Sequence, residues 1–470
     1  MTSALMNRKS LDELKAEDDG EHKLTKSLNA LSITAIGIGG IIGAGIFVLT
    51  GEAAAKYAGP GIMLSFVLGG IACTFVGLCY SELAALIPIS GSSYTYTYAT
   101  MGEFFAWIIG WDLVLEYAMG AATVSVGWSG YVVSVLNDIG VHIPAQLTKA
   151  PGTAIKLADG TDATALFNVP AAVIVLLLTF MLARGTKESA TINNVMVAVK
   201  LAVVVGFILL GAFYVDTSHW VPFIPENKGT FGEYGWSGVL RGAGVVFFAY
   251  IGFDAVSTTA QEAKKPQRDM PIGILGSLFI CTILYILVSA VLTGLVPYTE
   301  LNVDAPIAKG VDAVGLGWFS APIKIGALAG LTTVMLVLLY GQSRIFFTMS
   351  KDGLLPPLFS KVHPTAGTPY VSQYMIGGCV ALIGGLLPIS ILGEMVSIGT
   401  LFAFALVCGA VIYLRRSDAE AHRPFRVPGV PVVPVLGILS CLALMAGLPL
   451  DTWLRLIVWM AVGLIIYFAY

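Results

Sequence analysis

Residues 37–47 read GIGGIIGAGIF and residues 247–254 read FFAYIGFD, and the glycines in these two apolar stretches are the strongest indication of the architecture. The first places five glycines in nine residues inside a long apolar run, although each glycine costs a helix about 1 kcal/mol relative to alanine. Such a run favours either close helix packing or an unwound segment whose freed N–H and C=O groups bind something. A dinucleotide-binding loop is disfavoured, because no soluble strand precedes the glycines.

The second stretch favours the unwound interpretation. Gly252 lies between bulky residues in the middle of an apolar run, and Asp254 follows two positions later. A carboxylate at this depth costs about 2.5–3.5 kcal/mol to insert, so it should face a cavity or a partner. Two broken helices indicate inverted repeats with a binding site at the bilayer midplane. Their free N–H groups suit a carboxylate and their free carbonyls suit an ammonium, which together match an α-amino acid.

The composition indicates that lipid surrounds most of the chain. Of the 470 residues, 56% are hydrophobic and only 12% are charged, and the mean hydropathy is +0.83. No soluble core could bury that much apolar surface. We predict an all-α integral membrane protein of about twelve helices at about 20 residues per span. The predicted spans lie near 30–57, 62–87, 104–136, 168–183, 191–214, 238–261, 271–296, 317–348, 371–387, 391–414, 431–448 and 452–470.

These spans predict four regions and an orientation. Residues 1–27 form a cytoplasmic tail, 28–214 and 238–414 form two five-helix repeats of inverted topology, and 431–470 add two helices. With the N-terminus inside, 17 of the 26 Lys and Arg residues fall on the inner side and eight on the outer side. This bias predicts a multi-pass protein of the cell membrane with both termini in the cytoplasm.

Several function classes lose support. The six cysteines lie in apolar runs without a CxxC pair, and the five histidines lie in predicted tails or loops. We therefore expect no metal, no cofactor and no enzymatic activity. The basic residues form no dense patch, so no nucleic-acid partner is expected. An ion channel usually shows a repeated filter or charge rings, which the sequence does not display.

Three ionisable residues lie deep in predicted spans. Lys200 occurs in VMVAVKLAVVVGF, residues 195–207. Burial disfavours the charged amine, so Lys200 is a candidate proton carrier, and its ammonium could stand where a sodium-coupled relative holds sodium. Glu116 could recognise a cationic side chain, take part in proton transfer or pair with Lys200. Asp254 is a second candidate titratable group, while Asp112 is expected nearer the interface.

The motifs resemble those of the amino acid–polyamine–organocation (APC) superfamily, most closely the bacterial relatives of cationic and branched-chain amino acid permeases. The resemblance covers about residues 24 to 470. The motifs are IIGAGIF (41–47), PISGSSYTYTYATMGE (88–103), GWDLVLEY (110–117), FFAYIGFDAVST (247–258), KKPQRDMPIGI (264–274), YGQSRIFFTMSKDGLLP (340–356), IGTLFAF (398–404) and RPFRVPGVPVVP (423–434).

The resemblance implies a LeuT-like fold with the substrate between the first and sixth spans. Its carboxylate would meet N–H groups of Ala44 and Gly45, near Gly43. Lys200 corresponds to the lysine that proton-coupled relatives use in place of sodium, and Asp254 to a span-six acid linked to proton coupling or gating. Glu116 corresponds to the acidic position of cationic transporters. The expected ammonium contacts are the carbonyls of Ile41, Phe248, Ala249 and Ile251, with Phe248 also an aromatic lid.

Two departures from the family pattern bear on the site. Many relatives have Ser or Thr where Ala44 stands, which removes a hydroxyl but leaves the backbone donors. Met335 would narrow the side-chain pocket against bulky arginine.

The main hypothesis from the sequence is therefore an importer of cationic or neutral L-amino acids by proton symport with alternating access. The alternative is an exchanger of amino acids or amines with the same site. The expected partners are the L-amino acid, protons and membrane lipids. A small single-span accessory protein is a further candidate partner.

Overall fold

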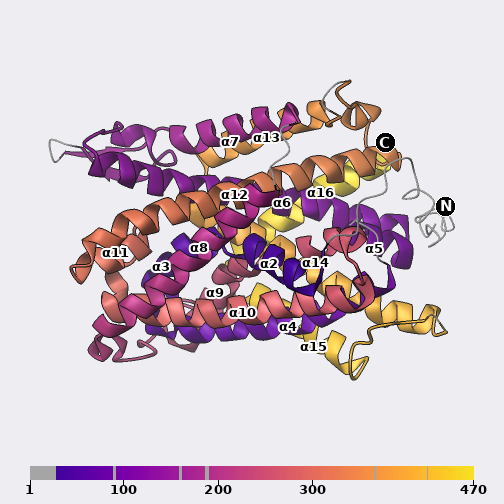
Figure 1. The fold of residues 1–470 in the computed structure, drawn as a ribbon, viewed down its shortest axis with the longest axis horizontal. Helices are drawn as coiled ribbons and strands as arrows, with labels where there is room; N and C mark the ends of the chain where they lie inside the picture. The colour runs from indigo at the N-terminus through magenta and orange to yellow at the C-terminus, as the bar shows by residue number, and fades with distance from the viewer. Residues whose placement is uncertain are drawn as a thin grey trace.

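The computed structural model describes residues 28–87, 92–157, 161–185, 190–364, 367–420 and 422–469. The predicted N-terminal tail, residues 1–27, and the start of the motif at 88–103 lie outside the described residues. The described chain is a bundle in which the long helices run roughly side by side (Figure 1). The end that carries the loops 139–168 and 215–234 is called the predicted outer end below, after the orientation expected from the sequence.

Helices make up nearly all of the regular secondary structure of the described residues, apart from one small hairpin in the 139–168 loop. The strands are β1 (Ala154–Lys156) and β2 (Asp162–Thr164), paired antiparallel. The α-helices are α2 (Ala30–Ile41), α3 (Thr50–Ala53), α4 (Ile62–Leu86), α5 (Ser92–Met101), α6 (Glu103–Asp138), α7 (Val169–Ala183), α8 (Ala190–Gly211), α9 (Gly235–Val246), α10 (Pro266–Leu295), α11 (Pro306–Ala313), α12 (Gly317–Lys351), α13 (Tyr370–Leu386), α14 (Ile389–Ser417), α15 (Val432–Ala446) and α16 (Leu450–Ala469).

The helices have the length and composition of membrane spans. Seven helical segments of the described residues are long and apolar enough to cross a bilayer, and α2, α7, α13 and α15 are shorter apolar helices. Large apolar side chains on α7, including Leu176, Leu177 and Phe180, are exposed, as expected where lipid is the solvent. The prediction of an all-α integral membrane protein is therefore confirmed.

The packing places two interrupted helices at the centre. α10 packs against both α4 and α2, while α6 packs against α12, α14 and α7. α2 and α9 lie among these long helices, and α7 and α13 pack together along one side of the bundle (Figure 1). Residues 41–50 and nearly all of 247–254 are buried in protein, which is where non-helical backbone is tolerated at membrane depth.

Backbone hydrogen bonds join the two interrupted helices at both ends. At one end, the Leu28 N–H donates to the Glu262 carbonyl at 2.9 Å and the Lys264 N–H donates to the Leu28 carbonyl at 2.8 Å. At the predicted outer end, the Tyr234 N–H donates to the Tyr57 carbonyl at 2.9 Å. The two helices are therefore linked before and after their breaks, and the breaks lie between the links.

Candidate functional site

The first break follows α2. α2 ends at Ile41, and Ile42 takes an extended conformation with φ −73° and ψ 101°. A π-helical segment, Gly45–Leu49, then continues the chain toward the predicted outer end. The break therefore lies inside the glycine-rich run, as the sequence predicted. The N–H groups of Gly43 and Ala44 come at the start of the outer half, where a helical turn leaves donors without partners within the helix.

The second break follows α9. Phe247–Tyr250 form a 3₁₀ turn, after which Ile251 is extended with ψ 136°. Gly252 has φ +116°, a conformation that L side chains rarely adopt. A Cβ atom on Gly252 would lie 2.7 Å from the Gly40 carbonyl oxygen, so the position also needs glycine for lack of space. The interruption predicted at 247–254 is present.

The two breaks face each other. A Cβ atom on Gly45 would lie 2.3 Å from the Cα and Cβ atoms of Ala249. Glycine therefore lets the backbone of the first broken helix touch that of the second at two places, Gly45 against Ala249 and Gly40 against Gly252. These contacts bring the predicted site residues Ile41, Gly43, Ala44, Gly45, Phe248, Ala249 and Ile251 into one region.

Lys200 hydrogen-bonds to backbone carbonyls at the C-terminal end of α2. Its side chain is completely buried on α8, and its Nζ donates to the carbonyl of Gly39 and, at 3.2 Å, to that of Ile42. The last carbonyls of a helix lack intrahelical donors and carry the negative end of its dipole, so an ammonium there is doubly favoured. The pairing of Lys200 with Glu116, one of the sequence alternatives, is not what the structure shows.

Tyr285 is a site residue that the sequence analysis missed. Its hydroxyl on α10 lies 2.8 Å from the Ile41 carbonyl oxygen and 2.8 Å from the Ala249 carbonyl oxygen. A hydroxyl has one proton and donates to one of them at a time. Tyr285 thus bridges the two breaks at two of the carbonyls expected to receive an ammonium. No local signal could have identified it, because it is one tyrosine in a long apolar span.

The carbonyls of the second break retain some accepting capacity. The Phe248 carbonyl accepts from the Ile251 N–H at 3.2 Å, and the Ala249 carbonyl is near Tyr285. Each carbonyl oxygen has two lone pairs, so one donor leaves room for a second. The Phe248 side chain is buried, with 6% exposed, and both ordinary packing and the predicted aromatic lid fit that burial.

Two buried carboxylates lie on α6. Glu116 is 1% exposed and Asp112 is 0% exposed, and their carboxylate oxygens make no hydrogen bond with any described residue. Asp112, expected nearer the interface, is fully buried and faces α14: a Cβ atom on Gly399 would lie 3.1 Å from its Oδ1. Thr400 on the same helix lies beside Glu116. Unpaired buried charges are costly, so protons or a bound cation should accompany this pair.

Asp254 lies just before the 3₁₀ turn Ala255–Glu262, and its carboxylate hydrogen-bonds back to the second break. It is 1% exposed, and its Oδ1 accepts from the Gly252 N–H at 3.2 Å. Its backbone carbonyl accepts from the Ser257 hydroxyl at 2.5 Å. Asp254 also lies within electrostatic range of Glu116. The carboxylate therefore has a local structural role in addition to any role in proton coupling.

Metal ligation finds no support in the described ranges. There, no group of three or more His, Cys, Asp or Glu side chains could hold a metal ion. The ligands that this region can offer are backbone N–H and C=O groups, one ammonium, one phenol and the carboxylates. Such a set has the donors and acceptors that would suit a polar solute.

Known proteins resemble the chain over its whole length. A family model described as amino acid permease matches residues 28–467. The branched-chain amino acid permease BcaP of Bacillus subtilis (strain 168) is 49% identical over 100% of this chain and 98% of its own length. The methylthioribose transporter of the same organism is 47% identical over 100% and 98%. Cationic amino acid transporter 4, vacuolar, of Arabidopsis thaliana is 37% identical over 88% and 67%.

Proposed function

The chain belongs to the amino acid permease family, and we propose that it imports L-amino acids, cationic or neutral, by proton symport with alternating access. Family membership makes it a transporter of amino acids rather than an enzyme. It also agrees with the APC resemblance of its motifs. The proposal includes twelve spans in a LeuT-like arrangement, with repeats at 28–214 and 238–414 and added helices at 431–470, and a cell membrane location with cytoplasmic termini.

One observation carries the proposal. The two helix breaks meet at Gly45 and Ala249, and Lys200 and Tyr285 donate to carbonyls on the same breaks. Backbone N–H groups on the outer side would bind the substrate carboxylate, and the carbonyls would bind its ammonium. Lys200 would carry the proton, because losing its charge would weaken its hydrogen bonds to the Gly39 and Ile42 carbonyls and so loosen α8 from α2. Asp254 would assist this coupling.

Transport assays test the function directly. Protein reconstituted in liposomes should accumulate labelled leucine or alanine when an inward proton gradient is imposed, and a protonophore should abolish the accumulation. Uptake that ignores the gradient contradicts symport. Counterflow that requires internal amino acid, with no net uptake, indicates the exchanger instead.

Methylthioribose is a necessary competitor in the same assay, because a relative named as its transporter is nearly as similar as the branched-chain permease. This sugar has hydroxyls but neither a carboxylate nor an ammonium, so it would leave the dipoles of the two breaks without matching charges. We expect leucine to compete with labelled leucine and methylthioribose not to compete. The reverse order rejects an amino acid as the main substrate.

The carboxylate of Glu116 should determine how strongly the protein prefers amino acids with a cationic side chain. Replacing it with glutamine is expected to weaken binding of arginine by about tenfold, since a charged hydrogen bond contributes about 1.5–3 kcal/mol. Leucine, which has no side-chain cation, should bind equally well to both proteins. Thermal shifts with each amino acid measure the difference. Equal losses for arginine and leucine would instead assign Glu116 to the proton path.

Tyr285→Phe isolates the bridging hydroxyl. The variant keeps the ring that packs against Phe66 at 5.4 Å between centroids, but it leaves the buried carbonyls of Ile41 and Ala249 without this donor. We expect KM for the amino acid to change at least as much as kcat, with a loss of about 1–3 kcal/mol in stability. Tyr250→Phe is the matched control, because the Tyr250 hydroxyl donates at 2.7 Å to the Phe66 carbonyl on α4 and not to a carbonyl of either break. Equal effects of the two variants on KM would remove Tyr285 from the site.

A further inference from the structure

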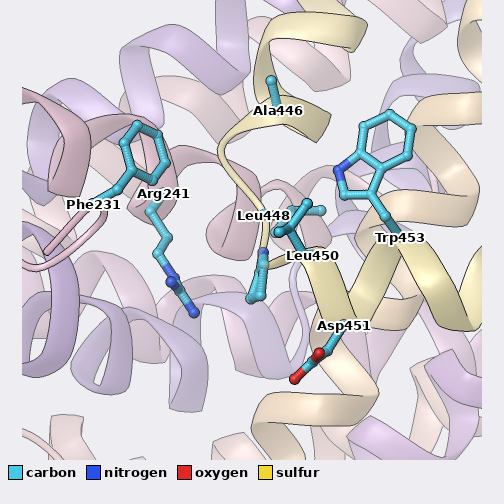
Figure 2. A pocket seen from close by; sticks show the side chains of 8 residues that line it. Phe231, Arg241, Ala446, Leu448, Leu450, Asp451 and Trp453 are labelled. Atoms are coloured by element: carbon cyan, nitrogen blue, oxygen red, sulfur yellow. The ribbon is translucent and has the colours of Figure 1, made fainter.

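A surface pocket at the predicted outer end lies apart from the helix breaks. It has a volume of about 670 Å³ and lies between the start of α9 and the turn that joins α15 to α16. Figure 2 shows side chains from these segments around it, with the Arg241 guanidinium and the Asp451 carboxylate both in view. The lining residues are Phe231, Arg241, Ala446, Leu448, Pro449, Leu450, Asp451 and Trp453.

Arg241 and Asp451 are the charged residues that line the pocket, and they do not form an ion pair with each other. The ion pairs of the described residues join Arg241 to Glu394, with 3.8 Å between Nη2 and Oε1, and not to Asp451. That separation is long for a charged hydrogen bond. The buried Nε–H of Arg241 makes no hydrogen bond within the described part of the chain. The guanidinium therefore has an unused donor, while the exposed carboxylate of Asp451 supplies a separate acceptor.

We propose that this pocket is a second ligand site, which binds a zwitterion carrying a primary ammonium and an anionic group. The anionic group would accept from Arg241 and the ammonium would donate to Asp451, while Leu448, Pro449 and Trp453 would cover the apolar part of the ligand. Two sources offer this chemistry: a free amino acid on its way to the midplane, and the headgroup of phosphatidylethanolamine.

Occupation of the pocket would act on neighbouring helices. Glu394 on α14 accepts from the Thr452 hydroxyl on α16 at 2.8 Å and approaches Arg241 on α9 through its other oxygen. An anionic ligand at Arg241 would compete with Glu394 for the guanidinium. Ligand binding would therefore weaken the link between α9, which leads into the second break, and α14.

The test uses the full-length protein in nanodiscs. Retained phosphatidylethanolamine is counted by native mass spectrometry, and bound labelled leucine is counted by equilibrium dialysis in nanodiscs of phosphatidylcholine alone. The trimethylammonium of phosphatidylcholine has no N–H and cannot donate to Asp451. We expect one of the two probes to bind at least tenfold more weakly to both Asp451→Asn and Arg241→Gln than to the wild type.

The variants separate a binding role from a folding role. Asp451 is exposed, so Asp451→Asn should fold normally even if Arg241→Gln loses stability with its Glu394 contact. Arg455→Gln is the matched control, because it removes a cation from α16 that does not line the pocket. Wild-type binding of both probes to Asp451→Asn overturns the proposal, and so does an equal loss of binding in Arg455→Gln. Neither outcome bears on the midplane site, which leucine uptake tests separately.

Discussion

Lys200→Met is expected to strongly reduce amino acid uptake driven by an inward proton gradient. Methionine has a similar length but no donor, so the Gly39 and Ile42 carbonyls lose the ammonium that now binds them. Each hydrogen bond to a charged group contributes about 1.5–3 kcal/mol, so gradient-driven uptake should fall about 10- to 100-fold or more. Uptake rates in liposomes with and without the gradient give the result.

A second buried lysine provides the control for Lys200. Lys324 on α12 is 5% exposed and pairs with Asp138 at 2.6 Å, at the predicted outer end and away from the breaks. Lys324→Met removes a buried charge of the same kind, so it should lower stability while uptake still responds to the proton gradient. A normal gradient response in Lys200→Met, or its loss in both variants, would contradict the assignment of the proton to Lys200.

Lys200→Arg separates charge from proton release. Arginine keeps the positive charge but does not lose its proton in proteins. The larger guanidinium must fit beside Gly330 of α12, where a Cβ atom would already lie 3.2 Å from the Lys200 side chain. If the variant folds, substrate binding should persist while the proton gradient no longer drives uptake.

Hydropathy predicted the helices well because lipid imposes a simple rule on sequence. Each span needs about 20 apolar residues, and loops need polar ones. The predicted span 62–87 therefore matches α4 closely, as 104–136 matches α6. The breaks were also predictable, because glycine runs and a buried aspartate are costly in a membrane helix unless they serve a site.

The partners of the site residues could not be predicted, because they depend on contacts between distant spans. Lys200 binds carbonyls some 160 positions earlier in the chain, with a sequence separation of 161 between Lys200 and Gly39. The sequence shows that a buried lysine needs acceptors, but carbonyls and carboxylates meet that need equally well. Tyr285 gives no signal of its own, and the depth of Asp112 depends on where α6 ends and how it tilts.

Long-range contacts also explain a motif that the sequence left without a role. Glu82 on α4 accepts from Arg415 at 2.9 and 2.7 Å and from the Val427 N–H at 2.7 Å, and Arg423 lies 3.3 Å from its Oε1. The motif RPFRVPGVPVVP thus holds the segment after α14 against the end of α4. Glu82 by itself does not predict these contacts, because its partners come more than 300 residues later in the chain.

Gly252→Ala adds only one methyl group, but it is expected to disrupt the site strongly. The residue has φ +116°, and such a conformation costs a non-glycine residue about 1–3 kcal/mol. The new Cβ would also lie 2.7 Å from the Gly40 carbonyl oxygen and 3.3 Å from the Ile41 N atom. These are backbone atoms of the first break and cannot rotate away. Separating the breaks should reduce uptake by at least about tenfold, since overpacking adds about 1–3 kcal/mol.

Gly378→Ala on α13 makes the same chemical change without the contact. A Cβ atom at Gly378 meets nothing within 4 Å, and alanine is favoured over glycine in a helix by about 1 kcal/mol. We therefore expect that variant to transport normally with unchanged or slightly raised thermal stability. If Gly252→Ala transported equally well, the breaks would tolerate separation. A ligand held between them by backbone dipoles could then not be the basis of transport, because those interactions weaken steeply with distance and misalignment.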